Sequence, residues 1–325
     1  MSEGLSVLPV EGLPEFHPGD DLAAAIVAAI DLADGDVVVV AQKVVSKVEG
    51  ALVDPPAVPA GEDPRRALAR REASEIVADS EAALIVRTKH GFVCANAGID
   101  ASNVSNGKLS LLPDDPDASA DALRRDLFRK AGADVAVVIA DTFGRPWRVG
   151  QTDVAIGLSG MRATRDERGR TDRVGHDLTV TDAAVADELA GAADLVRTKD
   201  AGVPVVVVRG FRWEPSGTAG AVDLVRDAET DLFRRGRGML AAALADGPWP
   251  QRWSGGVAPH ELYAARQVAP DLELMSEGPP TVLETRNQLA AGLAAAVLAD
   301  AGLRVRWRLE EGRVILESGR PAPAG

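Results

Sequence analysis

Residues 134–157 read DVAVVIADTFGRPWRVGQTDVAIG, and this stretch decides how the rest of the chain is interpreted. Residues 134–140 are almost all Val, Ile or Ala, which predicts a strand that is buried on both faces. Such a strand delivers Asp141 at its carboxyl end, where open α/β sheets place their ligands. Glycines, arginines and hydroxyl or amide side chains follow, so we interpret residues 141–157 as a polar, ligand-binding loop.

The side chains of this loop suit a metal ion and anionic ligands. Asp141 and Thr142 offer the oxygen donors that a hard cation such as Mg²⁺ prefers. Arg145 and Arg148 are suited to bind phosphate or carboxylate oxygens through two parallel hydrogen bonds. From residue chemistry alone, a polar loop with a structural salt bridge explains the segment equally well.

Two earlier segments carry the same kinds of side chain. Asp100 lies in GFVCANAGIDASN, residues 91–103, where a second carboxylate near Asp141 would complete a metal site. An Asp after a glycine turn more commonly forms an Asx turn or caps a helix, so both interpretations stay open. Lys43 and Lys47 lie in VVAQKVVSKVEG, residues 39–50, and helical spacing would place them on one face for phosphate binding. A solvated lysine pair is the alternative.

The rest of the chain alternates predicted helices and strands. Strands are predicted at 37–41, 83–87, 92–95 and 203–209, and helices at 21–33, 64–79, 119–131, 181–195 and 223–245. Pro, Trp and Gly then gather in residues 247–256, as in a linker. Helices at 259–267 and 281–301 and a hairpin over 304–317 are predicted beyond it. We therefore place a domain boundary between a domain of residues 1–245 and a small α/β module of residues 246–325.

Composition narrows the class of protein. The 325 residues carry a net charge of −13, which argues against a nucleic-acid partner. One cysteine, Cys94, cannot form an intramolecular disulfide, so a reducing compartment fits best. The apolar runs are too short to span a bilayer and residues 1–9 do not look like a signal peptide, so we expect a cytoplasmic protein without a membrane partner. The sequence lacks the Walker, Rossmann, nucleophile-elbow and HExxH motifs.

Seven segments, taken in order, resemble the coenzyme F420-0:gamma-glutamyl ligase family and cover roughly residues 8–240. They are LPVEGLPEFHPGDDL (8–22), DGDVVVVAQKVVSKVEG (34–50), GFVCANAGIDASN (91–103), LLPDDPDASADALR (111–124), DTFGRPWRVGQTDVAIG (141–157), ADELAGAADLV (186–196) and GVPVVVVRG (202–210). The resemblance implies an α+β (mixed α/β) fold in an intertwined homodimer, with residues 246–325 as an extra module.

The resemblance also implies a reaction. GTP would phosphorylate the terminal carboxylate of F420-0 to an acyl phosphate, and the amine of L-glutamate would then displace phosphate to form an amide. Further glutamates would join through gamma linkages. Mg²⁺ or Mn²⁺ is expected to assist, with K⁺ as a further candidate ion. The open alternatives are a ligase of the same chemistry acting on another phosphorylated acceptor and a non-catalytic, nucleotide-binding regulatory protein.

Site residues follow from the resemblance position by position. Metal ligands fall on Asp100, Asp141 and Thr142, and we predict catalytic roles for Asp141, Asp100 and Arg148. Nucleotide or substrate contacts are expected at Leu13, Pro14, Glu15, Phe16, Gln42, Lys47 and Asn103. Charge alone adds Lys43, Lys199 and Arg145 as phosphate- or carboxylate-binding residues.

Overall fold

The computed structural model describes residues 4–80, 83–101, 107–197, 202–227, 231, 253–278, 280–286, 294–295, 297–298, 303–310 and 313–321. The chain forms two compact units, which we call unit 1 (residues 1–75 and 83–231) and unit 2 (residues 76–82 and 232–325). Helices and several sheets are mixed along the chain, which confirms the mixed α and β class. The boundary predicted at 245/246 lies outside the described residues, and the intertwined dimer stays a prediction.

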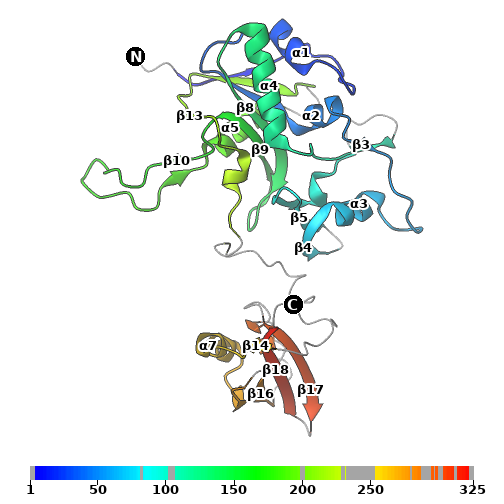
Figure 1. Cartoon of the computed structure of the whole chain (residues 1–325), viewed down its shortest axis with the longest axis vertical. Helices are drawn as coiled ribbons and strands as arrows, with labels where there is room; N and C mark the ends of the chain where they lie inside the picture. Colours follow the sequence, from blue (N-terminus) through cyan, green and yellow to red (C-terminus); the bar gives the residue numbers. More distant parts are fainter. Residues whose placement is uncertain are drawn as a thin grey trace. The chain divides into compact units, whose positions relative to one another are not determined.

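A six-stranded sheet forms the centre of unit 1 (Figure 1). Its strands follow the order β1 (Ser6–Pro9), β12 (Val205–Arg209), β2 (Val37–Ala41), β8 (Ala136–Gly144), β9 (Gln151–Met161) and β13 (Pro215–Ser216). Strands β2 and β8 run parallel, and the other neighbouring pairs run antiparallel. The carboxyl ends of β2 and β8 therefore meet at one edge of the sheet.

Helices cover both faces of this sheet. Alternate residues of β2 divide between two cores: Val38 and Val40 pack in the cluster of α1 (Leu22–Ala29) and α4 (Pro116–Ala131), and Val37 and Val39 in the cluster of α5 (Val185–Asp194). All four valines are completely buried, as the run of β-branched residues predicts. Burying each of them contributes on the order of 1.5–3 kcal/mol relative to exposure.

Gly157 allows α4 to lie close against β9. A Cβ atom at this position would stand 2.3 Å from the carbonyl oxygen of Pro116, in the first turn of α4. No L side chain fits that approach, so the glycine that ends the segment 141–157 has a packing reason. The helix begins after Asp115, whose carboxylate accepts a hydrogen bond from the amide of Ala118, and it ends at Gly132 in the left-handed conformation.

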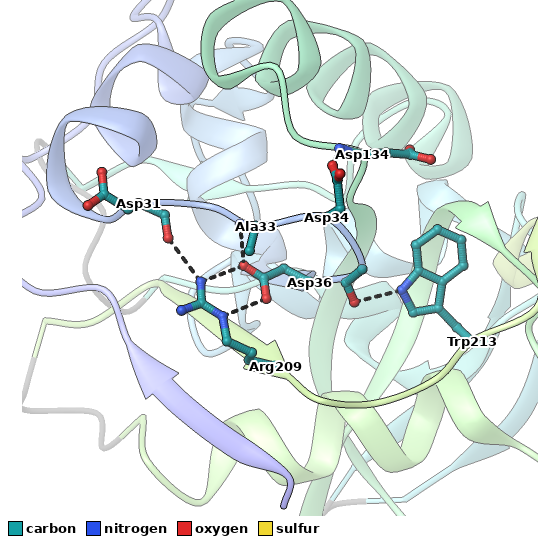
Figure 2. A network of polar contacts seen from close by, with 8 residues as sticks. Asp31, Ala33, Asp34, Asp36, Asp134, Arg209 and Trp213 are labelled. Carbon is teal, nitrogen blue, oxygen red and sulfur yellow. Dashed lines mark hydrogen bonds and ion pairs between the residues drawn. The ribbon is translucent and has the colours of Figure 1, made fainter. Parts of the chain in front are cut away.

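A network of polar contacts fixes the amino ends of β2 and β8 (Figure 2). The buried carboxylate of Asp36 accepts hydrogen bonds from Nε and Nη2 of Arg209, at 2.8 and 2.7 Å. Trp213 Nε1 donates to the backbone carbonyl just before Asp36 at 2.9 Å. The carboxylate of Asp34 accepts from the backbone amide of Asp134 at 2.8 Å. The turns before β2 and β8 and the end of β12 are thereby held together.

The shorter elements between residues 42 and 224 correct part of the sequence interpretation. They are α2 (Gln42–Val48), β3 (Leu52–Val53), α3 (Pro64–Glu72), β4 (Ala73–Asp79), β5 (Leu84–Thr88), β6 (Val93–Ala95), the 3-10 turn η1 (Asn96–Gly98), β7 (Leu109–Ser110), β10 (Arg165–Asp166), β11 (Asp182–Ala183) and the 3-10 turn η3 (Ala221–Leu224). The helix predicted over 64–79 is wrong beyond Glu72, because β4 joins the sheet of β5 and β6. Ile76 and Val77 are β-branched and favour a strand there.

Two other predicted helices also need correction. The helix predicted over 223–245 is replaced at its start by η3, and residues 225–227 are not helical. Most of the remainder of that range lies outside the described residues. The helix predicted over 281–301 is wrong at its start, since residues 281–285 form a strand. Thr281, Val282 and Thr285 supply the β-branched side chains that suit it.

Unit 2 contains an antiparallel sheet and a helix. The elements are β14 (Trp253–Gly255), α7 (Pro259–Val268), β15 (Glu273–Ser276), β16 (Thr281–Thr285), β17 (Arg304–Glu310) and β18 (Arg313–Pro321). The predicted C-terminal hairpin is confirmed, because β17 and β18 pair along their length. Leu283, Leu298 and Leu316 are among the buried residues of its core.

Every helix in the described part of the chain is too short or too polar to cross a membrane.

Candidate functional site

A pocket of about 1200 Å³ opens in unit 1 at the carboxyl end of β2. Its wall contains Ala41, the last residue of β2, and Ala140, the partner of Ala41 within β8, at the edge where α/β sheets commonly bind ligands. The remaining walls come from residues 13–16, from α2, from residues 95–100, from the start of β9 and from the segment after α5. Segments far apart in the sequence thus contribute to one site.

Asp141 and Asp100 both line this pocket. Strand β8 does not end at Asp141 but continues to Gly144, with a register irregularity between Ile139 and Ala140. Asp100 follows η1, and two backbone hydrogen bonds with Ser110, at 3.2 and 2.8 Å, hold its main chain. The backbone that carries the Asp100 side chain is therefore held by the bridge to Ser110.

The two carboxylates influence each other electrostatically. Burial raises the pKa of Asp141 to about 6, and the negative charge of Asp100 acts in the same direction. A hydrogen bond from the backbone amide of Thr142 and the charges of Lys43 and Arg197 oppose the rise. A carboxyl group whose pKa is raised, and which lies in a pocket close to a second carboxylate, marks a candidate functional site.

The donors in this corner of the pocket fit a divalent cation that shares its coordination shell with a ligand. Asp100, Asp141 and Thr142 provide two carboxylates and a hydroxyl. Within the described ranges, no group of three or more His, Cys, Asp or Glu side chains could hold a metal ion by itself. Mg²⁺ is commonly held by one or two carboxylates and completes its shell with water and substrate phosphates.

The two lysines of α2 face the pocket, as their helical spacing predicts. Nζ of Lys43 lies 2.7 Å from Oδ2 of Asp100. Nζ of Lys47 forms an ion pair with Oε1 of Glu15, which belongs to the predicted contact segment of residues 13–16. All four residues of that segment line the pocket. Cationic and anionic side chains therefore alternate around the site.

Gln42 also lines the pocket and anchors α2. Its side-chain amide donates to Oγ of Ser46 at 2.6 Å and to the backbone carbonyl of Leu111 at 2.9 Å. Ser46 Oγ donates to the same carbonyl at 2.6 Å. These bonds fix the helix that carries Lys43 and Lys47.

Two pocket residues escaped the sequence interpretation. Asp153 is buried, with 1% of its side chain exposed, and Oδ1 accepts a 2.7 Å hydrogen bond from Oγ1 of Thr142. Its other oxygen pairs with Nη2 of Arg197, which follows α5. The polar loop predicted over 141–157 is wrong, because β8 and β9 pair there and place Thr142 opposite Asp153. Gly144 and Gly150 flank the turn between two pairing segments, a hairpin signal that could have predicted this contact.

The predicted arginines of the hairpin lie differently. Arg148 is exposed in the turn and is not among the residues that line the pocket. Arg145 donates to the carbonyl of Val149 at 3.1 Å, within the same turn. Asn103 and Lys199 lie outside the described residues. The roles predicted for these four residues stay predictions.

Paired cationic and carboxylate side chains thus line one pocket of a mixed α/β protein. The family model described as F420-0:Gamma-glutamyl ligase matches residues 12–210, a range that contains every residue lining the pocket. The coenzyme F420:L-glutamate ligase of Methanothermobacter thermautotrophicus is 43% identical over 250 residues, which is 71% of this chain and 99% of the relative. The protein of that name from Natronomonas pharaonis is 44% identical over 248 residues, 71% of this chain and 95% of the relative. In Methanocaldococcus jannaschii it is 39% identical over 236 residues, 68% and 94% respectively. The chain belongs to the F420-0:gamma-glutamyl ligase family.

Proposed function

We propose that the protein is a GTP- and divalent-metal-dependent ligase that attaches L-glutamate to coenzyme F420-0. Membership of the family and the printed names of the relatives support the ligase activity and its substrates. The observation that carries the proposal is the grouping of Lys43, Lys47, Asp100, Asp141 and Thr142 around one pocket. GTP, F420-0 and glutamate are all anions, and an acidic protein needs such a local concentration of cationic groups to bind them together.

The proposed reaction has two steps, a phosphoryl transfer followed by an acyl transfer. A carboxylate oxygen of F420-0 attacks the γ-phosphorus of GTP, the bond from that phosphorus to the β-phosphate oxygen breaks, and GDP leaves. The amine of glutamate then attacks the acyl carbon of the resulting acyl phosphate. The bond between carbon and phosphate oxygen breaks, inorganic phosphate leaves, and the nitrogen releases one proton to water. Positioning and charge neutralisation are the main tasks of the protein in such transfers.

The described side chains can divide these tasks. Lys43 and Lys47, on the fixed helix α2, bind phosphate oxygens once an anionic ligand competes with Asp100 and Glu15. Asp100, Asp141 and Thr142 would hold Mg²⁺ or Mn²⁺. When bound, the cation offsets the repulsion between the carboxylate and the triphosphate. The residues around Leu13 and Phe16 form an apolar wall beside α2.

Mass spectrometry of the reaction mixture tests the proposal. Purified protein is incubated with F420-0, L-glutamate, GTP and Mg²⁺ or Mn²⁺, with and without K⁺. We expect a product heavier by one or more glutamyl units and one GDP for each unit added. GTP turnover that needs glutamate but a different acceptor would move the proposal to another carboxylate substrate. GTP binding without any turnover, in folded protein, would support a regulatory role instead.

We also propose that the protein acts as a homodimer. The segment between β10 and β11 extends from the body of unit 1 as a long arm (Figure 1). Val174 and Val180 on this arm are both exposed, so the arm presents apolar side chains that a second copy of the chain could bury. Light scattering after size-exclusion chromatography should give twice the chain mass. Replacing both valines with Ser should shift that mass toward the monomer, and an unchanged dimer would place the interface elsewhere.

A further inference from the structure

Arg197 differs from the lysines of the pocket because part of its guanidinium group is unsatisfied. Only 11% of its side chain is exposed, and Nη2 pairs with Asp153. Nη1 is buried and has no hydrogen-bond partner in the described part of the chain. A buried, charged donor without an acceptor is costly, so native proteins rarely keep one unless a ligand or water satisfies it. Arg197 lines the pocket, which is where such an acceptor would enter.

Asp153 connects Arg197 to Thr142, one of the predicted metal ligands. Its two oxygens are divided between Oγ1 of Thr142, at 2.7 Å, and the guanidinium group. The Thr142 hydroxyl gives its single proton to Asp153, so its lone pairs stay available to another partner. The same carboxylate prevents Arg197 from turning away from the pocket. One buried side chain therefore orients two groups that line the site.

The charges around this pair indicate that a ligand bound by Arg197 would be negatively charged. The charge of Asp153 is balanced by Arg197, and the charge of Arg197 also acts on the neighbouring Asp141. A cation that already has a carboxylate partner and still has a free N–H group can accommodate one more negatively charged oxygen. Two parallel N–H groups on a planar guanidinium suit phosphate and carboxylate geometry.

We propose that Arg197 binds an anionic oxygen of a substrate beside Asp141, and that Asp153 is the positioning residue that holds Arg197 and Thr142 for this task. The oxygen belongs either to a phosphate of the nucleotide or to the carboxylate of the amino acid. The identity of these substrates rests on the proposed function. The assignment of Arg197 as an anion-binding residue rests on the geometry of the pocket.

Equilibrium binding measures the role of Arg197 directly. Isothermal titration calorimetry with GTP and with GDP, in Mg²⁺, is run on the wild type, Arg197→Gln and Arg197→Lys. The KM for L-glutamate is measured on the same proteins. We expect Arg197→Gln to weaken one of these interactions by roughly 10- to 100-fold, the usual effect of a lost charge-assisted hydrogen bond. Arg197→Lys should recover part of that loss because it restores the charge.

The pattern of losses identifies the oxygen. Weaker GTP binding with unchanged GDP binding assigns Arg197 to the γ-phosphate, and equal weakening of both assigns it to the inner phosphates. A raised KM for glutamate alone assigns it to the amino acid carboxylate. Unchanged values for all three would overturn the proposal.

Asp153→Asn tests the positioning role, and Asp36→Asn is its matched control. Both aspartates are 1% exposed and both pair with an arginine, but Asp36 lies at the opposite end of β2. Asp153→Asn should reproduce the binding loss of Arg197→Gln, and the double variant should lose little more than either single one. Asp153→Asn should also weaken Mn²⁺ binding, because Thr142 is released. Electron paramagnetic resonance in the absence of substrates measures this binding. Asp36→Asn should leave all these affinities unchanged, and additive losses at Asp153 and Arg197 would overturn the positioning role.

Folding does not limit this test. Removing one partner of a buried pair leaves an uncompensated charge, whereas removing both does not. If a single variant is insoluble, the double variant with Asp153→Asn and Arg197→Gln is used instead, and its affinities for GTP and GDP and its KM for glutamate are measured. A protein that binds GTP through Arg197 but makes no glutamyl product would disprove the proposed function and leave this inference standing.

Discussion

Unit 1 contains two aspartate–arginine pairs whose carboxylates are equally buried and whose guanidinium groups differ in how well their hydrogen bonds are satisfied. Asp36 and Asp153 are each 1% exposed, and each accepts from a guanidinium group. Arg209 uses Nε and Nη2 on Asp36, and Nη2 also donates to the backbone carbonyl of Asp31 at 2.9 Å (Figure 2). Arg197 leaves Nη1 buried without a described partner. Burial of the carboxylate therefore does not separate a structural pair from a ligand-binding one, whereas an unsatisfied guanidinium donor does.

Their positions agree with this difference. The Asp36 pair joins the start of β2 to the end of β12, and neither of its residues lines the pocket. The Asp153 pair lies where β8 and β9 border the pocket. The same residue types thus stabilise the sheet at one end and prepare a binding surface at the other.

The largest effect is expected from Asp141→Asn, at the pocket end. A neutral amide cannot offset the charge of a metal ion or help position an anionic substrate through it, so kcat should fall at least about 100-fold. The fold should survive, because burial already disfavours the charged form of Asp141. Turnover by the mass-spectrometric assay and thermal unfolding of the same sample give the two readings. Near-normal turnover would show that the metal assignment is wrong.

Arg209→Gln should have the next largest effect, and on stability alone. It leaves the buried carboxylate of Asp36 without its cation, and loss of one partner of a buried pair costs about 3–5 kcal/mol. Because 42% of the Arg209 side chain is exposed, solvent screens the pair and we expect about 2 kcal/mol. Urea unfolding measures this change, and GTP affinity well below the unfolding transition should match the wild type. A fall in GTP affinity would remove the distinction between the two pairs.

The sequence predicts the parts of this site that depend on local spacing. Lys43 and Lys47 follow from helical periodicity, and Asp141 follows directly after the buried part of β8, which is a run of Val, Ile and Ala. Asp153 and Arg197 depend on contacts between segments, namely the register of β9 against β8 and the path of the chain after α5. Neither leaves a periodic signal in the sequence.

The fold shows the same division between local and long-range information. The strand over 37–41 is predicted correctly because a continuous β-branched run needs burial on both faces. Residues 73–79 follow a charged helix without a breaking glycine or proline, so their change to a strand depends on pairing with β5. Tertiary pairing overrides local propensity there.

Lys47→Ala should weaken GTP binding by about 10-fold, a smaller effect because Lys47 is one of several cations. Lys89→Ala is a matched control, since Lys89 pairs with Asp114 at 2.6 Å and does not line the pocket. Titration calorimetry of both variants with GTP separates a pocket cation from a surface one. Equal affinities for the two variants would contradict the role of Lys47.

Asp187→Asn probes a third, partly buried carboxylate and should have the smallest effect. Asp187 lies in the first turn of α5, and its Oδ1 accepts a 2.8 Å hydrogen bond from the backbone amide of Ala155 instead of from a guanidinium group. Burial raises its pKa above the ordinary value of 3.8, and that hydrogen bond opposes the rise. The folded state therefore holds this proton more tightly than the unfolded state does.

The sign of the pH dependence follows from this difference. Below the ordinary pKa both states are protonated and the carboxyl group costs nothing. As pH rises through the folded-state pKa the unfolded state ionises more easily, so the wild type loses stability relative to the Asn variant, which keeps the hydrogen bond to Ala155. The variant's Tm minus that of the wild type should thus rise by up to about 3 °C between pH 4 and pH 8. A difference that stays constant would show that the amide bond satisfies the ionised carboxylate fully, as Arg209 does for Asp36. A difference that falls with pH would mean that a cation near α5 stabilises the charged form of Asp187. The positive charge beside the pocket would then include a group other than Arg197.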